Sequence, residues 1–224
     1  MSTFVLIPGA GGAAWYWHRV VPLLEEAGHQ AIAVDLPADD ERKGIHAYAD
    51  IVAGALGSRS GVLVAQSLGG FTAALVAPRV TVERIVFVNA MIPLPGETAG
   101  AYWENTRSEE ARTDAARRHD YPVEFDLATY FLHDVPEQVA KAGAEHERPE
   151  AEIALAEPAS FERWPEVPIL VVIGKDDRFF PPGFQARVAR ERLGQNVRIA
   201  EIPGGHLVAL SRPRELAALL ISGK

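Results

Sequence analysis

Val62-Leu63-Val64-Ala65-Gln66-Ser67-Leu68-Gly69-Gly70 is an apolar run that ends at a serine and continues through glycines into a helical pattern. A continuous apolar run predicts a strand that is buried on both faces, as in a parallel sheet covered by helices. In such sheets ligands bind beyond the carboxyl ends of the strands. We therefore expect Ser67 to lie at a ligand-binding edge of the sheet.

The same alternation of strand and helix extends along the chain. Similar apolar runs predict further strands at residues 4–7, 31–34, 84–89, 169–173 and 197–202. Helical spacing predicts helices at residues 15–27, 45–56, 69–78, 182–193 and 213–221. This order predicts an α/β fold with a six-stranded, mainly parallel sheet flanked by helices.

One interval breaks the alternation. Between residues 91 and 164, repeated prolines separate short and weakly periodic helical pieces. We interpret residues 91–164 as a helical lid inserted into a core made of residues 1–90 and 165–224.

Composition excludes several classes of protein. The 224 residues include 30 Asp and Glu and 22 Lys and Arg, which gives a formal net charge of -8. This charge argues against nucleic acid as a partner, because a polyanion requires a basic face on the protein. Hydrophobic residues make up 48% and charged residues 23%, which is typical of a globular domain rather than a disordered chain. The chain has no cysteine, so disulfides, thiolate metal sites and a cysteine nucleophile are excluded.

Signals for export or for membrane insertion are not evident in the sequence. The N-terminus has no basic stretch followed by a signal core, and no apolar run approaches the roughly 18 residues that suggest a membrane span. We expect a cytoplasmic protein without a membrane partner.

Residues Ala65 to Gly69 are close to the G-x-S-x-G nucleophile elbow, in which a serine lies on a sharp turn between strand and helix. Small residues are needed on both sides of the serine because the turn presses those positions together. Ala65 replaces the first glycine, and its single methyl group is the smallest possible departure.

Two further residues at predicted strand ends complete a catalytic set. His206 follows the sixth strand and can take the proton of the Ser67 hydroxyl, while Asp177 follows the fifth strand and can hold the imidazole in its reactive tautomer. Asp176 is the competing carboxylate. The order serine, aspartate, histidine is that of α/β serine hydrolases.

The glycine-rich loop after the first strand has two interpretations. Gly9-Ala10 can offer a backbone N–H to a developing oxyanion, together with the N–H of Leu68. The same loop, residues 9–14, also matches the dinucleotide pattern G-x-G-x-x-A, with Asp35 at the end of the next strand. However, a dinucleotide site leaves Ser67, Asp177 and His206 unexplained.

Over almost its whole length the chain resembles the α/β-hydrolases, and more narrowly the compact group of plant methyl esterases, hydroxynitrile lyases and related bacterial esterases. The resemblance rests on residues 4–10, 17–25, 66–70, 177–185 and 205–206. It implies Ser67 as nucleophile, His206 as general base and Asp177 as its orienter. It also implies an oxyanion hole formed by the N–H groups of Ala10 and Leu68.

Departures from the family pattern narrow the expected reaction. Pro8 replaces a usual histidine and alters the loop that carries Ala10. Lyases of the group have Thr at the position of Gly9 and Lys at the position of Leu207, so the resemblance favours ester hydrolysis over cyanohydrin cleavage. Cleavage of a carbon–carbon or amide bond by the same triad stays open, as does a non-catalytic ligand-binding protein on this fold.

We expect hydrolysis of small or aromatic carboxylic esters through an acyl-enzyme, without a cofactor. Aromatic residues of the lid and first loop are the candidate walls of the substrate pocket: Trp15, Tyr102, Trp103, Tyr130 and Phe131. His119, His133 and His146 are scattered without a metal-binding pattern, so no metal is expected.

Overall fold

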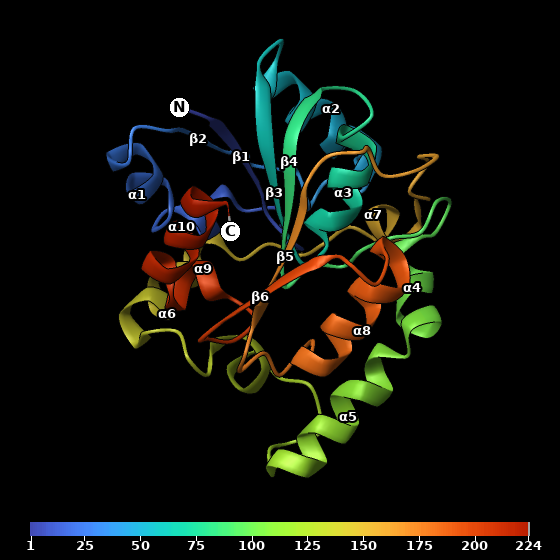
Figure 1. Cartoon of the computed structure of the whole chain (residues 1–224). Helices are drawn as coiled ribbons and strands as arrows, with labels where there is room; N and C mark the ends of the chain where they lie inside the picture. The colour runs from blue at the N-terminus through green and yellow to red at the C-terminus, as the bar shows by residue number, and fades with distance from the viewer. Residues whose placement is uncertain (224) are drawn as a thin grey trace.

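A computed structural model describes residues 1–223 and has a twisted six-stranded sheet at its centre (Figure 1). The strands are β1 (Thr3–Ile7), β2 (Gln30–Ala33), β3 (Ser60–Gln66), β4 (Thr81–Val88), β5 (Ile169–Gly174) and β6 (Arg198–Ile202). Their spatial order is β2-β1-β3-β4-β5-β6, and every neighbouring pair is parallel. All six predicted strands are present, and the predicted α/β class is confirmed.

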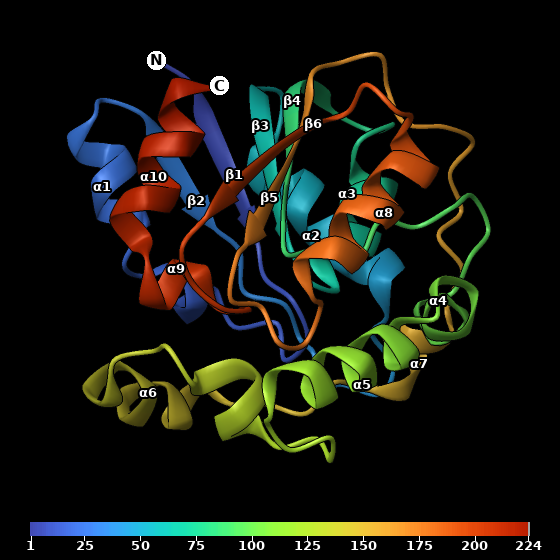
Figure 2. The ribbon, with the colours of Figure 1, turned by 60° about the horizontal axis from the view of Figure 1, so that its bottom comes forward.

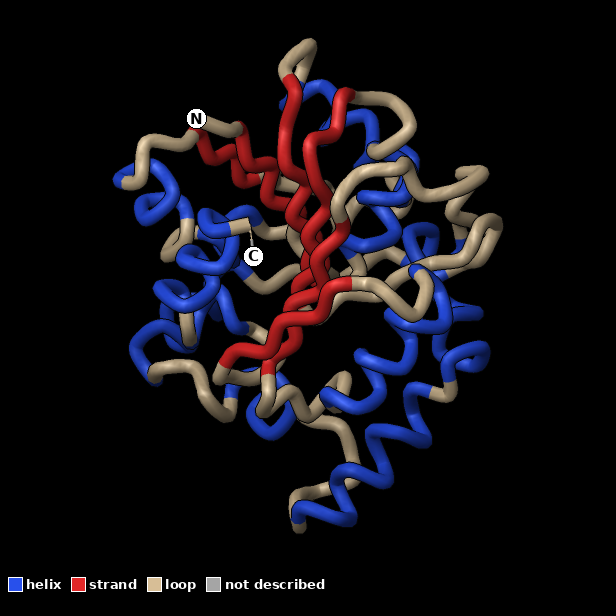
Figure 3. Tube along the Cα trace, viewed as in Figure 1, coloured by secondary structure: helices blue, strands red, loops and turns tan. Residues whose placement is uncertain are grey.

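Side chains alternate between two apolar layers along each strand, as β1 illustrates. Phe4 and Leu6 face the layer formed with η1 (Ala14–Trp17), α1 (Val21–Glu26), α9 (Val208–Ser211) and α10 (Pro213–Ser222). Val5 and Ile7 face the layer formed with α2 (Ile45–Leu56), α3 (Gly69–Val76) and α8 (Pro182–Leu193). Figure 3 shows the strands between these two groups of helices. Each fully buried aliphatic or Phe side chain contributes roughly 1.5–3 kcal/mol, so the two layers hold the strand ends in fixed positions.

One predicted helix differs from the structure, and one observed helix was not predicted. The helix predicted at residues 15–27 is divided into the 3₁₀ helix η1 and the helix α1, whose first turn contains Pro22. Proline is favoured in the first turn of a helix because its missing N–H needs no partner there. The short helix α9 was not predicted, because four residues are too few for a periodic pattern to be recognised.

The segment between β4 and β5 contains α4 (Ala99–Thr106), α5 (Ser108–His119), η2 (Ala128–Leu132), α6 (Glu137–Gly143), η3 (Ala144–His146) and α7 (Glu152–Ala156). Figure 2 shows α4, α5, α6 and α7 lying across one end of the sheet. A bridge between Thr98 and Pro158 joins the start of this segment to its return. Within residues 1–223, no helix has the length and apolar content needed to span a membrane.

The sheet order places the loops after β1 and β3 side by side. The chain runs from β1 outward to β2 and then returns past β1 to β3, so the order reverses between β1 and β3. A Cβ on Gly69 would lie 2.6 Å from the Pro8 carbonyl oxygen, and only glycine permits this close approach. Ligands of open parallel sheets bind at such a reversal.

Candidate active site

Ser67 lies on a strained turn between β3 and α3. Its φ of 49° is in the left-handed region, which a residue other than glycine adopts at a cost of about 1–3 kcal/mol. The turn is held by the Ser67 carbonyl, which accepts the Met91 N–H at 2.9 Å. A Cβ at Gly70 would overlap the Met91 carbonyl oxygen, so the glycine after the turn is required. The geometry is that of the nucleophile elbow predicted from the motif.

The structure brings Ser67, His206 and Asp177 together from three different strand ends. The distance from Ser67 Oγ to His206 Nε2 is 3.1 Å, and that from His206 Nδ1 to Asp177 Oδ2 is 2.9 Å. His206 and Asp177 are only 2% and 3% exposed. With Nδ1 donating to the carboxylate, Nε2 is the nitrogen that can accept the Ser67 hydroxyl proton.

The structure also distinguishes the two neighbouring aspartates. Asp177 Oδ1 accepts the backbone N–H groups of Phe179 and Phe180, each at 2.9 Å, which fixes the carboxylate against His206. Asp176 is exposed, and its Oδ2 accepts the Gly204 N–H at 3.0 Å. Asp177 is therefore the carboxylate that faces the imidazole.

Asn89 is a buried residue of the site that the sequence interpretation missed. Its side-chain Nδ2 donates to the carbonyls of Gly205 and His206 at 2.9 and 3.1 Å, and its Oδ1 accepts the Gly174 N–H at 2.8 Å. Asn89 thus ties the end of β4 to the histidine loop and to the end of β5. A polar residue ending an apolar strand run, as Ser67 does after β3, was the signal that could have identified it.

Gln185 is a second residue that the sequence interpretation missed, and its side chain hydrogen-bonds to the Asp177 carboxylate. Its Nε2 donates to Asp177 Oδ2 at 3.0 Å and to the Phe180 carbonyl at 2.7 Å. It projects from α8 and is only 4% exposed. Together with the two backbone N–H groups, it holds the Asp177 carboxylate in place beside His206.

Aromatic rings surround the His206 imidazole. Phe131, from η2, stacks on it with ring centroids 4.8 Å apart and planes at 26°. Phe179 and Phe180 meet it edge-on at 5.1 and 5.4 Å. The lid therefore contributes one face of the histidine's surroundings, and the loop after β5 contributes the others.

Two backbone N–H groups near Ser67 have no hydrogen-bond partner within the described chain: that of Ala10, which lines the same cavity as Ser67, and that of Leu68, the next residue in the chain. Neither the Ala10 N–H nor the Leu68 N–H donates a hydrogen bond to any of residues 1–223. The loop after β1 turns tightly, because the Gly12 N–H donates to the Gly9 carbonyl at 3.1 Å. Pro8 is buried directly after β1. Because the hydrogen bond that closes the turn joins Gly9 and Gly12, the missing N–H of Pro8 leaves the turn intact. Two unpaired N–H groups close to a serine hydroxyl could donate hydrogen bonds to an oxygen atom of a bound ligand.

The return of the lid holds this loop through Glu150. One carboxylate oxygen accepts the Gly11 N–H at 2.8 Å, and the other accepts the Tyr48 hydroxyl from α2 at 2.7 Å. Burial raises the pKa of Glu150 above its ordinary value, although these hydrogen bonds oppose the shift. The residue after Ala10 is therefore positioned by a lid side chain.

Arg148 makes the second attachment of the lid to the same loop. Its Nε donates to the Gly11 carbonyl at 3.0 Å, and its other two nitrogens donate to Asp35 at 2.9 and 3.1 Å. Asp35 also accepts the Ala14 N–H at 2.9 Å. Partial burial alone raises the pKa of Asp35, but the hydrogen bonds from Arg148 and Ala14 outweigh it and lower the pKa below its ordinary value. Asp35 is thus occupied by Arg148, which removes the support for a dinucleotide site in this loop.

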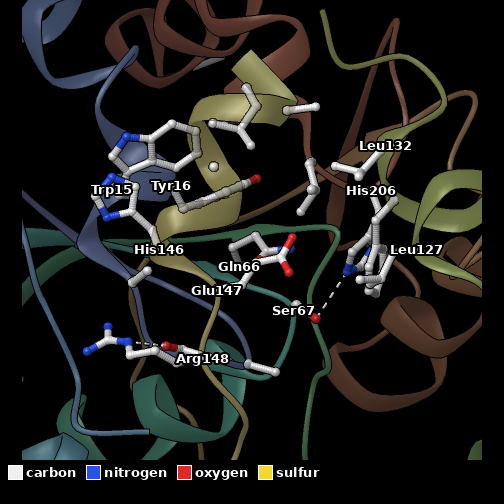
Figure 4. Close-up of a pocket in the computed structure, with 18 of the residues that line it drawn as sticks. Trp15, Tyr16, Gln66, Ser67, Leu127, Leu132, His146, Glu147, Arg148 and His206 are labelled. Atoms are coloured by element: carbon white, nitrogen blue, oxygen red, sulfur yellow. Dashed lines mark hydrogen bonds between the residues drawn. The ribbon is translucent and has the colours of Figure 1, made fainter. Parts of the chain in front are cut away.

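A cavity of about 340 Å³ opens in front of Ser67 and His206. Figure 4 shows the Ser67–His206 hydrogen bond at one end of this Ser67 cavity and Trp15 with His146 at the other. Much of its wall is apolar, including Ala10, Ala13, Leu127, Leu132, Val139 and Leu207. Trp15 and Phe131, two of the predicted pocket residues, line it.

Tyr102, Trp103 and Tyr130 do not line the Ser67 cavity, which corrects the prediction for these three. Tyr102 is 1% exposed and packs against Phe71, and Trp103 packs against the rings that follow Asp177. Tyr130 is fully buried, and its hydroxyl donates to the Pro122 carbonyl at 2.6 Å. Tyr102 and Trp103 thus pack between the lid and the core, whereas the Tyr130 ring packs against Tyr121 and Phe125 within the lid.

The histidines of the lid do not form a metal centre. In the part of the chain that the structure describes, no group of three or more His, Asp or Glu side chains is arranged to hold a metal ion. His146 instead stacks on Trp15 with centroids 5.0 Å apart.

Known proteins resemble this chain over nearly all of its length. Methylesterase 7 of Arabidopsis thaliana is 30% identical and covers 97% of this chain and 94% of that protein. Norfluorocurarine synthase 1 of a Strychnos species is 27% identical over 97% of this chain and 93% of its own length. The alpha-hydroxynitrile lyase of Arabidopsis thaliana is 27% identical over 95% of this chain and 93% of that protein.

Solved structures show the same fold. The crystal structure of polyneuridine aldehyde esterase superposes with a TM-score of 0.79 at 23% identity, covering 99% of this chain and 98% of that one. A family model described as the alpha/beta hydrolase family matches residues 4–219. The chain therefore belongs to the alpha/beta hydrolase family.

Proposed function

We propose that this protein is a serine hydrolase that cleaves carboxylic esters of small or aromatic substrates. The observation that carries the proposal is the hydrogen-bonded series from Ser67 Oγ to His206 Nε2 and from His206 Nδ1 to Asp177, placed at the end of the Ser67 cavity. In this proposal Ser67 is the nucleophile, His206 the general base and acid, and Asp177 the residue that orients the imidazole.

The first half of the reaction forms an acyl-enzyme. Ser67 Oγ attacks the ester carbonyl carbon while its proton passes to His206 Nε2. The N–H groups of Ala10 and Leu68 donate to the oxyanion of the tetrahedral intermediate. The bond between the carbonyl carbon and the alkoxy oxygen then breaks, and His206 gives its proton to the leaving alcohol.

The second half regenerates the enzyme. A water molecule loses a proton to His206 Nε2 and attacks the acyl carbon. The bond to Ser67 Oγ breaks, the proton returns to that oxygen, and the carboxylic acid leaves. Asp177 remains ionised throughout and stabilises the imidazolium in both halves.

The size and lining of the Ser67 cavity support the choice of substrate. Its volume of about 340 Å³ is at the lower end of the range of small-molecule sites, and its wall includes several aliphatic side chains together with Trp15 and Phe131. Relatives named as esterases and methylesterases support the ester as the bond that is cleaved.

Gly9 favours hydrolysis over the lyase reaction. A Cβ at this position would lie 2.3 Å from Gln66 Oε1 and 2.8 Å from Ser67 Cβ. A threonine, which the lyases of the group have there, would require both neighbours to move. This chain also has Leu207, rather than a lysine, directly after His206.

The proposal is tested by assaying short and aromatic acyl esters, together with a cyanohydrin, using the wild type and a Ser67→Ala variant. Ester turnover should fall by at least about 10⁴-fold in Ser67→Ala, because the nucleophile is lost while the rest of the site remains. A matched control is Ser60→Ala at the opposite end of β3, where the hydroxyl donates to Glu83 and should not affect turnover.

A serine-reactive phosphonate provides an independent measurement. Mass spectrometry should find one adduct, on the peptide containing Ser67, in the wild type and in Ser60→Ala but not in Ser67→Ala. Full ester hydrolysis by purified Ser67→Ala would refute the nucleophile assignment. Turnover of the cyanohydrin alone would instead identify a lyase.

A further inference from the structure

Gln66 is a buried polar side chain in the Ser67 cavity that the mechanism above does not use. It is 4% exposed and lines the cavity directly before the proposed nucleophile (Figure 4). Its carboxamide makes no hydrogen bond with any other part of the described chain. The carboxamide is therefore left to hydrogen-bond with water or with the ligand that enters the cavity, and a ligand that displaces the water without replacing its hydrogen bonds binds less tightly.

The carboxamide lies close to the reacting atoms. Gln66 Oε1 and Ser67 Cβ are 2.3 and 2.8 Å from the same point, the position of a Cβ built on Gly9. The carboxamide is therefore a neighbour of the carbon that carries the nucleophilic oxygen. A group bound to it belongs to the part of the substrate adjoining the ester, not to a remote end.

The charges around the Ser67 cavity exclude an anionic partner for Gln66. Glu147 and Glu150 both line it, and the Glu147 carboxylate has no ion pair or hydrogen bond with the described residues. Among the described residues, Arg148 is the only Arg or Lys that lines the cavity, and it is occupied by Asp35 and the Gly11 carbonyl. A substrate carboxylate would therefore be buried without a counter-charge, which is costly.

We propose that Gln66 is a specificity-determining residue whose carboxamide binds an uncharged polar substituent, such as a hydroxyl group, beside the scissile ester. This inference rests on the proposed function. It narrows the substrate class to uncharged esters that carry a hydroxyl group, in preference to esters that lack the hydroxyl group or carry a negative charge. An amide both donates and accepts, which matches the two capacities of a hydroxyl group.

The test compares three esters that differ only at the carbon next to the carbonyl: methyl mandelate with a hydroxyl group, methyl phenylacetate with hydrogen, and the monomethyl ester of phenylmalonic acid with a carboxylate. For the wild type we expect kcat/KM for the mandelate to exceed that for the phenylacetate by about 10- to 100-fold, because a buried amide left unpaired penalises the analogue. The anionic ester should be the poorest substrate.

The variant Gln66→Met keeps the length of the side chain and removes both hydrogen-bonding atoms. Its ratio of kcat/KM for mandelate over phenylacetate should fall toward one. Gln195→Met makes the same replacement at an exposed position outside the cavity and should retain the wild-type ratio. A wild-type ratio near one, a ratio unchanged in Gln66→Met, or equal losses on both esters would overturn the proposal.

Binding distinguishes this proposal from the hydrolase assignment. Calorimetry with the Ser67→Ala variant measures the Kd of the mandelate and phenylacetate esters without turnover, and the Kd should be about tenfold lower for the mandelate. Adding Gln66→Met should remove the difference. If the wild type hydrolyses neither ester but the Kd values still differ, the proposed function is refuted and the role of Gln66 stands. If the Kd values are equal, the role of Gln66 is refuted.

Discussion

The two sides of the Ser67 cavity are held in place by largely different parts of the molecule. On the side of the proposed triad, called the triad side below, Asp177 and His206 are fixed by Asn89 and Gln185, which lie at the end of β4 and on α8. On the side of the proposed oxyanion hole, called the oxyanion side below, the loop carrying Ala10 is attached to the lid through Arg148 and Glu150.

This difference has a physical consequence. The triad side depends mainly on strand ends whose positions follow from the packing of the sheet, and the lid adds the Phe131 ring against His206 and the Asp134 carboxylate, which accepts the Gly205 N–H at 2.7 Å. The oxyanion side depends on side chains that lie 137 and 139 residues from Gly11 along the chain and return across the end of the sheet. Changes at Arg148 and Glu150 should therefore alter the stabilisation of the oxyanion while the serine, histidine and aspartate remain in contact.

The largest effect on catalytic activity is expected from a change on the triad side. Asp177→Asn should lower kcat by about 10⁴-fold, because the amide no longer holds the required imidazole tautomer. Asp176→Asn is the matched control, and it should change kcat by only a few-fold because Asp176 contacts a backbone N–H rather than the imidazole. Steady-state ester hydrolysis measures both. Equal losses in the two variants would mean that Asp177 is not the orienting carboxylate.

A smaller effect is expected on the oxyanion side. Glu150→Ala should lower kcat by about 10- to 100-fold, less than the roughly 10²- to 10³-fold loss of a complete oxyanion donor, because the loop is released but the donor remains. Glu150→Gln should recover part of the loss, since its carbonyl oxygen can still accept the Gly11 N–H. The matched control Glu152→Ala changes an exposed residue of α7. An unchanged kcat in Glu150→Ala would show that the lid does not position this loop.

The smallest effect on activity is expected at the other attachment of the lid. Glu97, before α4, pairs with Arg192 of α8, with Nη2 to Oε1 at 2.9 Å, and their side chains are 4% and 6% exposed. Burial alone raises the pKa of Glu97, but the hydrogen bonds from Arg192, Asn105 and the Leu94 N–H outweigh it and lower the pKa. Glu97→Gln should leave kcat near the wild-type value, because neither partner lines the Ser67 cavity. At neutral pH it should reduce the free energy of unfolding by roughly 3–5 kcal/mol, as expected when one partner of a buried pair is removed.

The pH dependence of this loss follows from the lowered pKa of Glu97. A carboxyl group whose folded pKa lies below its unfolded value stabilises the fold above the unfolded pKa and loses that contribution as the pH falls through the folded pKa. The difference in the free energy of unfolding between wild type and Glu97→Gln, measured by urea unfolding, should therefore shrink below about pH 4.5, which is the ordinary pKa range of Glu. A difference that stays constant down to pH 3 would contradict the assigned role of the ion pair.

The sequence allowed much of the triad side to be predicted. A strand buried on both faces is a continuous apolar run, and the loop that follows it lies at the ligand-binding edge. Ser67, Asp177 and His206 could therefore be proposed from their positions after strands, together with the serine motif and the chemistry of their side chains. Asn89 has the same position after β4, but because it has no nucleophilic or basic group it was not singled out, and its contacts with the histidine loop are visible only in the structure.

The lid was predicted far less well. Aromatic residues there were proposed as pocket walls, but composition does not indicate the direction in which a ring points. Tyr102 and Tyr130 pack into the interior, whereas Phe131 stacks on the histidine. Gln66 belongs to the serine motif. That its carboxamide has no hydrogen-bond partner among the described residues depends on which side chains surround it in the folded chain.

The sequence by itself determined the strand order along the chain, the alternation that builds two apolar layers, and the serine, aspartate and histidine at three strand ends. These features are local, because each depends on the period of apolar residues or on the few residues of one turn. Only the tertiary structure decided between Asp176 and Asp177, attached Arg148 and Glu150 to the loop of Ala10, and left Gln66 unpaired in the cavity. Such pairings join residues far apart in the chain, and their energies depend on distances that exist only once the sheet and the lid have packed together.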